Sequence, residues 1–155
     1  MNKVVVLEHL RAAKAAHIKW VQKAKLLISG LPIKEDAIPV DSTECKFGKW
    51  FYGEGQKLNA MPNNSLDCMT KIETLHFELH DIYLKIFKIY FNKPQKGFMA
   101  KVFGNKKKDL TTQEHSDAKQ FYDDMEAISR ELLEEIGRLE RRLLAIPEEE
   151  LNNIM

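Results

Sequence analysis

Three long segments of the chain carry apolar side chains at alternating spacings of four and three residues. They cover residues 4–29, the stretch from residue 65 to before Pro94, and the stretch from residue 111 or 112 to 146. This rhythm predicts three amphipathic helices that each bury one stripe. The expected stripes are Val6, Leu10, Ala13, His17, Trp20, Ala24 and Leu27; Met69, Ile72, His76, Leu79, Tyr83, Ile86 and Tyr90; and Phe121, Met125, Ile128, Leu132, Ile136, Leu139, Leu143 and Ile146.

A short fourth helix is predicted over residues 43–52. The sequence Asp41-Ser42-Thr43-Glu44 matches a capping box, which would place Cys45 in the first turn. A second box, Thr111-Thr112-Gln113-Glu114, begins the last long helix, and Gly30 and Pro147 end the first and the last. No segment alternates with a period of two, so no strand is predicted. The expected fold is all-α and four-helix-bundle-like, with three long helices and one short helix that bears Cys45.

The chain has 155 residues, which predicts a single domain over residues 1–155. Residues 147–155, after the last long helix, are expected to be a flexible tail. The third helix carries apolar residues outside its main stripe, at Leu75, Ile82 and Ile89, and the fourth is long enough to extend past the others. Spare apolar surface of this kind is often covered by a second copy of the chain, so we expect a homodimer.

Charge and composition exclude several classes of partner. With 24 basic and 23 acidic residues the net charge is +1, so no nucleic-acid partner is indicated. The basic run Lys106–Lys108 is expected in a solvated loop. No stretch approaches the ~20 apolar residues that span a membrane, so no membrane insertion is expected. The two cysteines, Cys45 and Cys68, make no disulfide framework, which favours the reducing cytoplasm and leaves Cys68 as a buried free thiol.

His17 and His76 occupy stripe positions where leucine would be ordinary. One such histidine is most simply a core residue that bonds a carbonyl or a tyrosine. Here His80 follows His76 by four residues, so the two rings project from one side of the same helix. Cys45 is expected at the start of the short helix, where the backbone amides favour a thiolate. Three imidazoles and one thiolate from three helices would complete a tetrahedral Zn²⁺ site.

Other metal chemistries fit these residues less well. His76-Phe77-Glu78-Leu79-His80 is not His-Glu-x-x-His, so the general base of a zinc peptidase is missing. Glu73-x-x-His76 matches one half of a di-iron carboxylate site, and such sites need two halves. A zinc-dependent hydrolase would use three histidines and an open position, with Cys45 off the metal. A metal-free interaction scaffold, with His17 and His76 as ordinary core residues, is the other alternative.

The segment Cys45-Lys46-Phe47-Gly48-Lys49-Trp50-Phe51-Tyr52 resembles the core of the chemoreceptor zinc-binding (CZB) domain. In that family a cysteine is followed by leucine or phenylalanine, then glycine, then an aromatic pair. His17-Ile18-Lys19-Trp20 also resembles the family's first-helix motif. The resemblance implies that Zn²⁺ is bound by His17, Cys45, His76 and His80, with Trp20, Phe47, Gly48 and Trp50 as supporting residues. Gly48 is expected to permit close helix approach near the metal.

The resemblance further implies a regulatory module rather than an enzyme. CZB domains are usually attached to bacterial chemoreceptors or diguanylate cyclases, and they have been connected with sensing zinc and the oxidation of the cysteine by hypochlorous acid. It therefore implies zinc or redox sensing through Cys45, linked to chemotaxis or cyclic-di-GMP signalling, with a chemoreceptor or another signalling protein as partner. The chain lacks a cyclase signature and a receptor signalling hairpin, so we expect a stand-alone member or part of a longer protein.

Overall fold

The computed structural model describes residues 2–61, 66–91 and 110–154 of the chain. In these ranges the protein is helical and has no strand, which confirms the all-α prediction. The elements in chain order are α1 (Lys3–Ile28), the 3-10 helix η1 (Glu35–Ala37), α2 (Lys46–Tyr52), the 3-10 helix η2 (Glu54–Ala60), α3 (Leu66–Phe91), α5 (Thr112–Ala145) and α6 (Glu148–Ile154). The expected Lys106–Lys108 loop lies outside the described residues.

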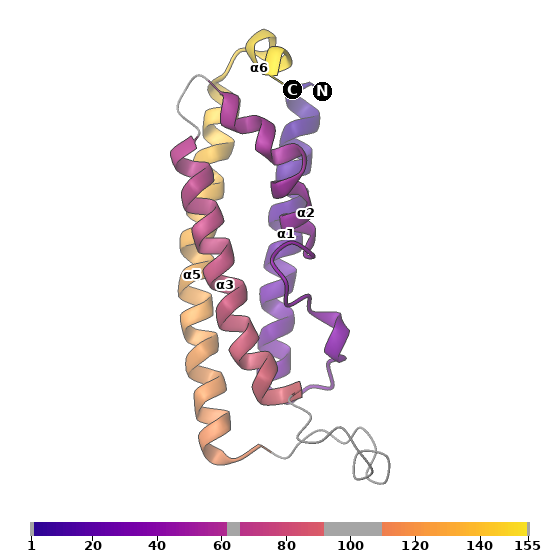
Figure 1. The fold of residues 1–155 in the computed structure, drawn as a ribbon, viewed down its shortest axis with the longest axis vertical. Helices are drawn as coiled ribbons and strands as arrows, with labels where there is room; N and C mark the ends of the chain where they lie inside the picture. The colour runs from indigo at the N-terminus through magenta and orange to yellow at the C-terminus, as the bar shows by residue number, and fades with distance from the viewer. Residues whose placement is uncertain (1, 62–65, 92–109, 155) are drawn as a thin grey trace.

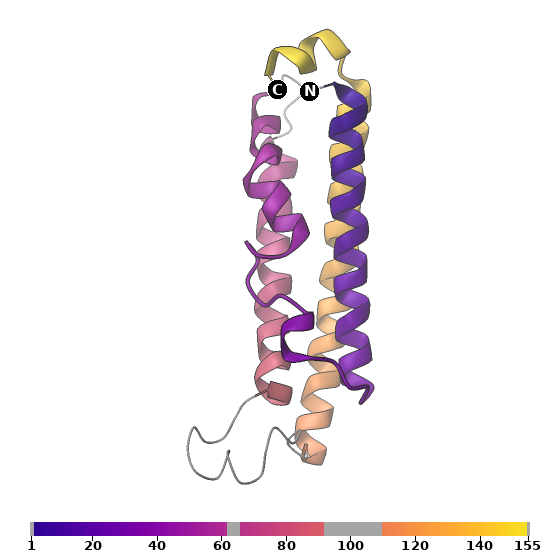
Figure 2. The same ribbon diagram turned by 90° about the vertical axis from the view of Figure 1, so that its right-hand side faces the viewer.

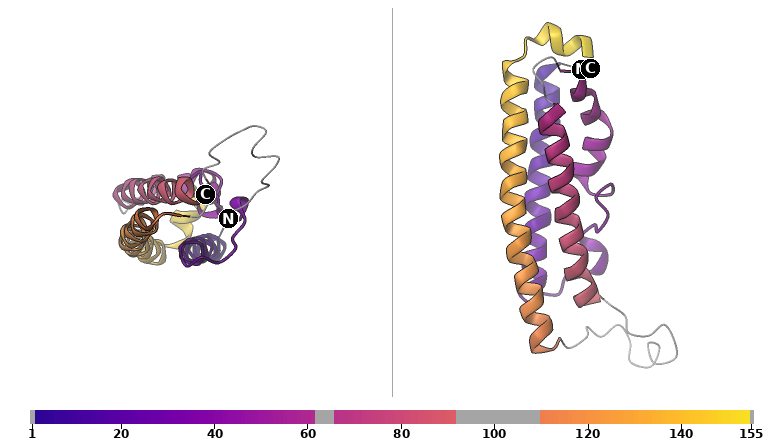
Figure 3. Two further views of the ribbon diagram at one scale, coloured as in Figure 1. Left: turned by 90° about the horizontal axis from the view of Figure 1, so that it is seen from below. Right: turned by 60° about the vertical axis from the view of Figure 1, so that its left-hand side comes forward.

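The three long helices α1, α3 and α5 run side by side (Figures 1 and 2). Helix α5 packs along both α1 and α3, while α2 packs on α1 and η2 packs on α3. In the end-on view of Figure 3 the segment that holds α2 and η2 lies near the fourth position of the bundle. The architecture is therefore a bundle of three long helices whose fourth position is filled by a short helix and its flanking segment.

The buried stripes follow the sequence pattern closely in α1 and α3. All seven expected residues of α1 are buried, and in α3 every expected residue is buried except Tyr90, which is partly exposed. In α5 the stripe is turned by one residue over its first half. Tyr122 and Ser129 are buried, and the expected Phe121 and Ile128 are half-buried. Both stripes keep the spacing of four and three, so periodicity alone could not choose between them. The prediction took the stripe with the more apolar side chains.

The start of the short helix differs from the prediction. Helix α2 begins at Lys46, and Cys45 is its N-cap residue rather than a member of its first turn. The Asp41 carboxylate accepts hydrogen bonds from the backbone N–H and the hydroxyl of Thr43, which makes a local turn ahead of the helix. The expected box at Thr111 is confirmed, because Thr111 and Glu114 each accept a backbone N–H from the other.

The residues after Pro147, expected to be a flexible tail, form α6. This short helix crosses the end of the bundle where both termini lie (Figure 1). Leu151 is fully buried there, and α6 contacts α1 and η2. Leu151, with the partly buried Ile154 packed beside the core, thus docks an otherwise acidic and polar segment. Separately, the described helices include none that is both long enough and apolar enough to cross a membrane.

Candidate metal centre

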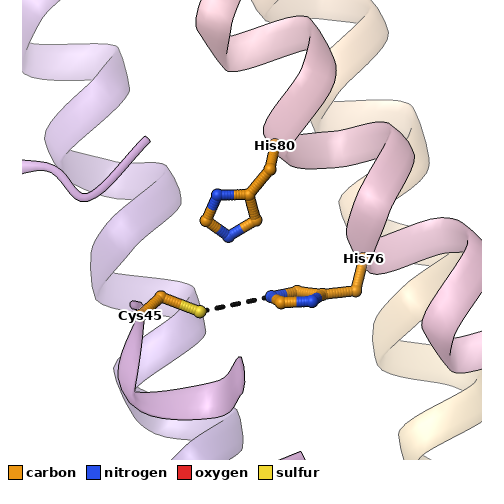
Figure 4. A group of neighbouring side chains, drawn as sticks. All are labelled: Cys45, His76 and His80. Atoms are coloured by element: carbon orange, nitrogen blue, oxygen red, sulfur yellow. Dashed lines mark hydrogen bonds between the residues drawn. The ribbon is translucent and has the colours of Figure 1, made fainter. Parts of the chain in front are cut away.

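Helix α3 directs two histidines toward the Cys45 side of the bundle (Figure 4). His76 and His80 are one turn apart, so their rings stand on the same face, with centroids 4.7 Å apart. Their exposed fractions are 1% and 4%. A buried imidazole needs partners for its ring nitrogens, because an unpaired polar atom in the core is costly. This face of α3 therefore buries two imidazoles whose ring nitrogens need partners.

Cys45 reaches the same place from the end of a connecting segment. We call residues 38–45 the Cys45 segment; it begins at the buried Ile38 and ends at the N-cap of α2. The backbone N–H of Gly48 donates to Cys45 Sγ at 3.2 Å, and the thiol approaches the Ser42 carbonyl at 3.6 Å. The first turn of α2 thus fixes the position of the sulfur.

The ligand atoms of Cys45, His76 and His80 all lie within 4.8 Å of one another. Cys45 Sγ and His76 Nε2 are 3.2 Å apart. Metal–ligand bonds of about 2.0–2.3 Å in a tetrahedral zinc site place ligand atoms roughly 3.3–3.8 Å from each other. The spacing of this pair is therefore close to that of two ligands of one ion.

His80 is held in the tautomer that a metal ligand needs. Its Nδ1 lies 2.8 Å from the carbonyl oxygen of Val40. A carbonyl can only accept, so Nδ1 carries the proton and Nε2 presents its lone pair to the site. Metal-binding histidines commonly donate their second ring N–H to a carbonyl in this way.

Buried polar atoms without a partner are concentrated at this site. Among the described residues, the buried side-chain nitrogens and oxygens that lack a hydrogen-bond partner are His17 Nδ1 and Nε2, His76 Nδ1, His80 Nε2 and the Tyr83 hydroxyl. All but the hydroxyl belong to the predicted ligand histidines. A cation would satisfy lone pairs that the protein leaves unpaired, and one sulfur with imidazole nitrogens is a donor set typical of Zn²⁺. The residues therefore fit the metal.

Burial controls the protonation of these groups in the metal-free protein. It lowers the pKa of His17 and of His76 from 6.5 to about 3, with a smaller contribution from neighbouring imidazoles. It also lowers the pKa of His80. Burial raises the pKa of the Cys45 thiol and outweighs the N–H groups of Gly48 and Phe47, which act in the opposite direction. The start of α2 alone therefore does not favour the thiolate form of Cys45 that was expected from the sequence. The three histidines are held in the neutral form, which is the form that binds metal.

His17 lies beside this cluster rather than within it. The structure places its ring 5.5 Å from the ring of His76 and 6.5 Å from that of His80, measured between centroids. The group whose ligand atoms approach within 4.8 Å consists of Cys45, His76 and His80. His17 is 1% exposed, and neither of its ring nitrogens has a hydrogen-bond partner within the described part of the chain. Its role as the fourth ligand remains a prediction.

Aromatic side chains enclose the histidines. Trp20 stacks on His17 with centroids 5.5 Å apart, and its ring lies 4.3 Å from that of His80. Its indole N–H donates to the Pro39 carbonyl at 2.9 Å, so Trp20 ties α1 to the Cys45 segment. Phe47 is buried against His76, with centroids 4.8 Å apart. Trp50 is half-buried and packs on Phe47 at 5.9 Å.

Gly48 is required by contact with its own connecting segment, not by the close approach of two helices that was expected from the sequence. A Cβ atom at this position would lie 1.8 Å from the carbonyl oxygen of Ser42. The neighbour that Gly48 admits is therefore the backbone of the Cys45 segment, not another helix. Sequence reasoning also missed the carbonyls of Pro39 and Val40, which accept from Trp20 and His80. Backbone acceptors leave no residue-type signal, although both lie in the short connection before the predicted cysteine helix.

Comparison with known families agrees with this geometry. Residues 17–87 match the family described as the chemoreceptor zinc-binding domain, CZB. The matched range is slightly less than half of the chain, and it includes His17, Cys45, His76 and His80. No curated protein and no solved structure matches the chain. CZB is a sensory, regulatory domain rather than an enzyme family. The CZB match and the Cys/His cluster together support a zinc-binding sensory module.

Proposed function

We propose that this protein is a zinc sensor in which Cys45, His76 and His80 hold Zn²⁺ with His17 as the fourth ligand. The observation that carries the proposal is the buried cluster whose three ligand atoms lie within 4.8 Å of one another. His80 already presents an unprotonated Nε2, because its Nδ1 donates to Val40. His17 is the best candidate for the fourth donor, since both of its nitrogens are buried and lack partners among the residues that the structure describes.

The chain's own residues explain how ligation becomes a structural signal. Cys45 belongs to a segment between two helices, whereas His76 and His80 belong to the middle of α3. Bound Zn²⁺ would supply a cross-link between the two, and the binding energy would stabilise the folded segment. Without it, the segment is held by the bonds from Trp20 and His80 to carbonyls and by the packing of Phe47.

Oxidation of Cys45 would act on the same element. A two-electron oxidant such as hypochlorous acid transfers oxygen to the thiolate sulfur, which gives a sulfenic acid while chloride leaves. The sulfur then loses its capacity as a thiolate ligand, and the polar product must be accommodated beside Phe47 and His76. We propose that α2 switches between a docked and a released state, and that loss of the thiolate ligand favours the released state. The aromatic side chains that α2 then exposes would bind a partner protein, which is the output signal.

The proposed setting is bacterial signalling in the cytoplasm, where thiols stay reduced. The CZB match supports an association with chemoreceptors, and the related proposal is a link to cyclic-di-GMP signalling. A homodimer is proposed because large apolar side chains remain exposed, including Val4 at 60% and Leu144 at 51%. Cross-linking of the intact protein at several concentrations would test the dimer directly.

Metal analysis of the purified protein tests the site. We expect about one zinc per chain after supplementation and removal of loose metal. Cys45→Ala, His76→Ala and His80→Ala should each weaken zinc binding by at least about tenfold, measured by competition with a chromogenic chelator. His17→Ala tests the fourth ligand by the same readout. His9→Ala and Cys68→Ala are matched controls, since His9 is an exposed histidine of α1 and Cys68 is a buried thiol of α3 outside the cluster.

Cobalt substitution gives a second readout. Four-coordinate Co²⁺ bound by a thiolate shows a sulfur-to-metal charge-transfer band and intense visible bands, and both should depend on Cys45. Zinc bound equally well by wild type and Cys45→Ala would contradict the proposal. If the protein binds one zinc per chain and hypochlorous acid does not release it, the zinc-binding proposal stands and the proposal of a redox output is contradicted.

A further inference from the structure

A pocket of about 220 Å³ opens on the outer side of the candidate metal centre. It lies between α1, η1 and the start of α2, and its wall includes side chains of all three. His17 and Cys45 both line it, although their exposed fractions are only 1% and 4%. Exposed residues, among them Lys19 and Lys46, and the buried rings of Trp20 and Phe47 also line it. The pocket therefore connects solvent with two residues of the centre.

Its inner end is formed by the imidazole of His17 and the sulfur of Cys45. His17 is buried, and in residues 2–61, 66–91 and 110–154 neither its Nδ1 nor its Nε2 finds a hydrogen-bond partner. Cys45 Sγ accepts the Gly48 N–H, while the apolar rings of Trp20 and Phe47 lie beside these groups in the pocket wall. A small ligand with one polar end could contact both residues without displacing the core.

The entrance is cationic. Lys19, Lys23 and Lys46 line the pocket against a single carboxylate, Asp36. Within the described part of the chain none of the three lysines forms an ion pair with a carboxylate, and Lys23 is within 3.4 Å of the Ala37 carbonyl. Charged walls around a low-dielectric cleft concentrate ions of opposite sign and repel ions of the same sign. The net charge of the whole chain, +1, gives no indication of this local excess of positive charge.

We infer that this pocket is a binding and entry site for small anions, which reach Cys45 and His17 through it. The inference deepens the proposed function, because it names the class of small molecule that reaches the sensing cysteine through this pocket: compact carboxylates or oxyanions. It places no constraint on the route by which Zn²⁺ reaches the cluster. It rests on the pocket and its lysines, and it needs no bound metal.

Alkylation of Cys45 by two reagents of equal shape tests the inference. Iodoacetate is an anion and iodoacetamide is neutral; with either, the thiolate sulfur forms a bond to the CH₂ carbon and iodide leaves. The experiment uses the metal-free protein of residues 1–155 with Cys68→Ala, so that one thiol reacts. The ratio of the two rate constants cancels the thiolate fraction, since both reagents attack the same sulfur. The same protein unfolded in urea gives the intrinsic ratio.

We expect the ratio of iodoacetate to iodoacetamide rates to be about three- to tenfold higher in the folded than in the unfolded protein. Raising the ionic strength to about 1 M, where the Debye length is about 3 Å, should remove the excess. Lys19→Glu combined with Lys46→Glu should reverse the preference. Lys119→Glu with Lys14→Glu makes the same change in net charge outside the pocket lining and should leave the ratio unchanged.

The inference would be overturned by a folded ratio equal to the urea ratio, or by an identical fall in both double variants. A folded protein whose Cys45 reacts with neither reagent would overturn it as well. Failure of the zinc proposal is distinguishable, because it appears in the metal analysis and leaves this ratio untouched. If the protein binds zinc but Cys45 shows no preference for iodoacetate over iodoacetamide, the anion site is contradicted and the zinc proposal is not.

Discussion

At the scale of single residues, the position of the Cys45 sulfur depends on the absence of a side chain three residues later. Gly48 donates its N–H to Sγ, and the Ser42 carbonyl occupies the space where a Cβ would be. The metal centre is therefore assembled from a tight backbone turn as much as from its ligands.

Gly48→Ala is expected to destabilise the protein by about 3 kcal/mol or more, because its methyl group would lie 1.8 Å from backbone that cannot rotate away. Urea unfolding measures the change, and zinc affinity should fall with it. Gly137→Ala is the matched control within α5. Its Cβ would meet only the Arg141 guanidinium at 3.4 Å, so we expect a gain of about 0.5–1 kcal/mol from helix propensity. Equal stability of wild type and Gly48→Ala would contradict this account.

Residue types and their spacing identified the candidate ligands, and the structure shows where that information stops. His76, His80 and Cys45 were predicted together and lie together. The sequence could not show that His17 stands 5.5 Å from the His76 ring, because ring placement depends on how α1 and α3 are spaced by α5. It also could not show that burial, rather than the helix end, dominates the pKa of the Cys45 thiol.

At the scale of elements, the Cys45 segment is tied to two helices through adjacent carbonyls. Trp20 of α1 donates to Pro39, and His80 of α3 donates to Val40. The segment has little regular structure of its own, so its order depends on these bonds, on the burial of Ile38 and on any ligand at Cys45.

Metal removal is predicted to loosen this element selectively. In the zinc-loaded protein, amide hydrogens of residues 38–53 should exchange at least about tenfold more slowly than after chelation, because binding energy is ordering energy here. Helix α5 contributes no side chain to the cluster and should change little. Hydrogen exchange followed by mass spectrometry resolves the two regions. Chelation that leaves residues 38–53 unchanged, or that has the same effect in Cys45→Ala, would refute the coupling.

The C-terminal helix makes a further prediction. Leu151 is fully buried, so Leu151→Ala should cost about 2–4 kcal/mol if α6 is docked as described. Leu144→Ala removes the same group from a side chain that is 51% exposed and should change the free energy of unfolding by less than about 0.5 kcal/mol. Thermal and urea unfolding of both variants measure the difference. Equal effects would show that residues 147–155 behave as the tail that their polar composition suggested.

The existence of each long helix was predicted correctly from its period, although in the first half of α5 the buried stripe was displaced by one residue, and prediction was poor where no long period existed. Helices α1 and α3 repeat their stripe over several turns, which fixed both their existence and their buried faces. The short α2 has too few residues to show a period, so its start depended on a capping pattern that in fact makes a turn at Asp41. The 3-10 helices η1 and η2 follow turn-forming residues and carry no periodic signal.

At the scale of the whole molecule, zinc should act as a folding ligand. A ligand that binds only the native state at about 1,000 times its Kd adds about 4 kcal/mol. For a domain of this size that raises Tm by roughly 8–16 °C. Calorimetry at increasing buffered free zinc measures the shift, which should be lost in Cys45→Ala and retained in Cys68→Ala. A Tm that does not depend on free zinc in the wild type would exclude this linkage.

The arrangement of the long helices gives the Cys45 segment a mechanical importance. Helix α5 packs on both α1 and α3, while the short helix α2 packs on α1 and η2 packs on α3. The Cys45 segment leads into α2, and its Pro39 and Val40 carbonyls bond Trp20 of α1 and His80 of α3, so the segment bridges these two helices. Seating it more deeply or withdrawing it would change how far the two helices splay apart, and a helix about 39 Å long, from its 26 residues, would amplify a small hinge angle at one end into a larger displacement at the other.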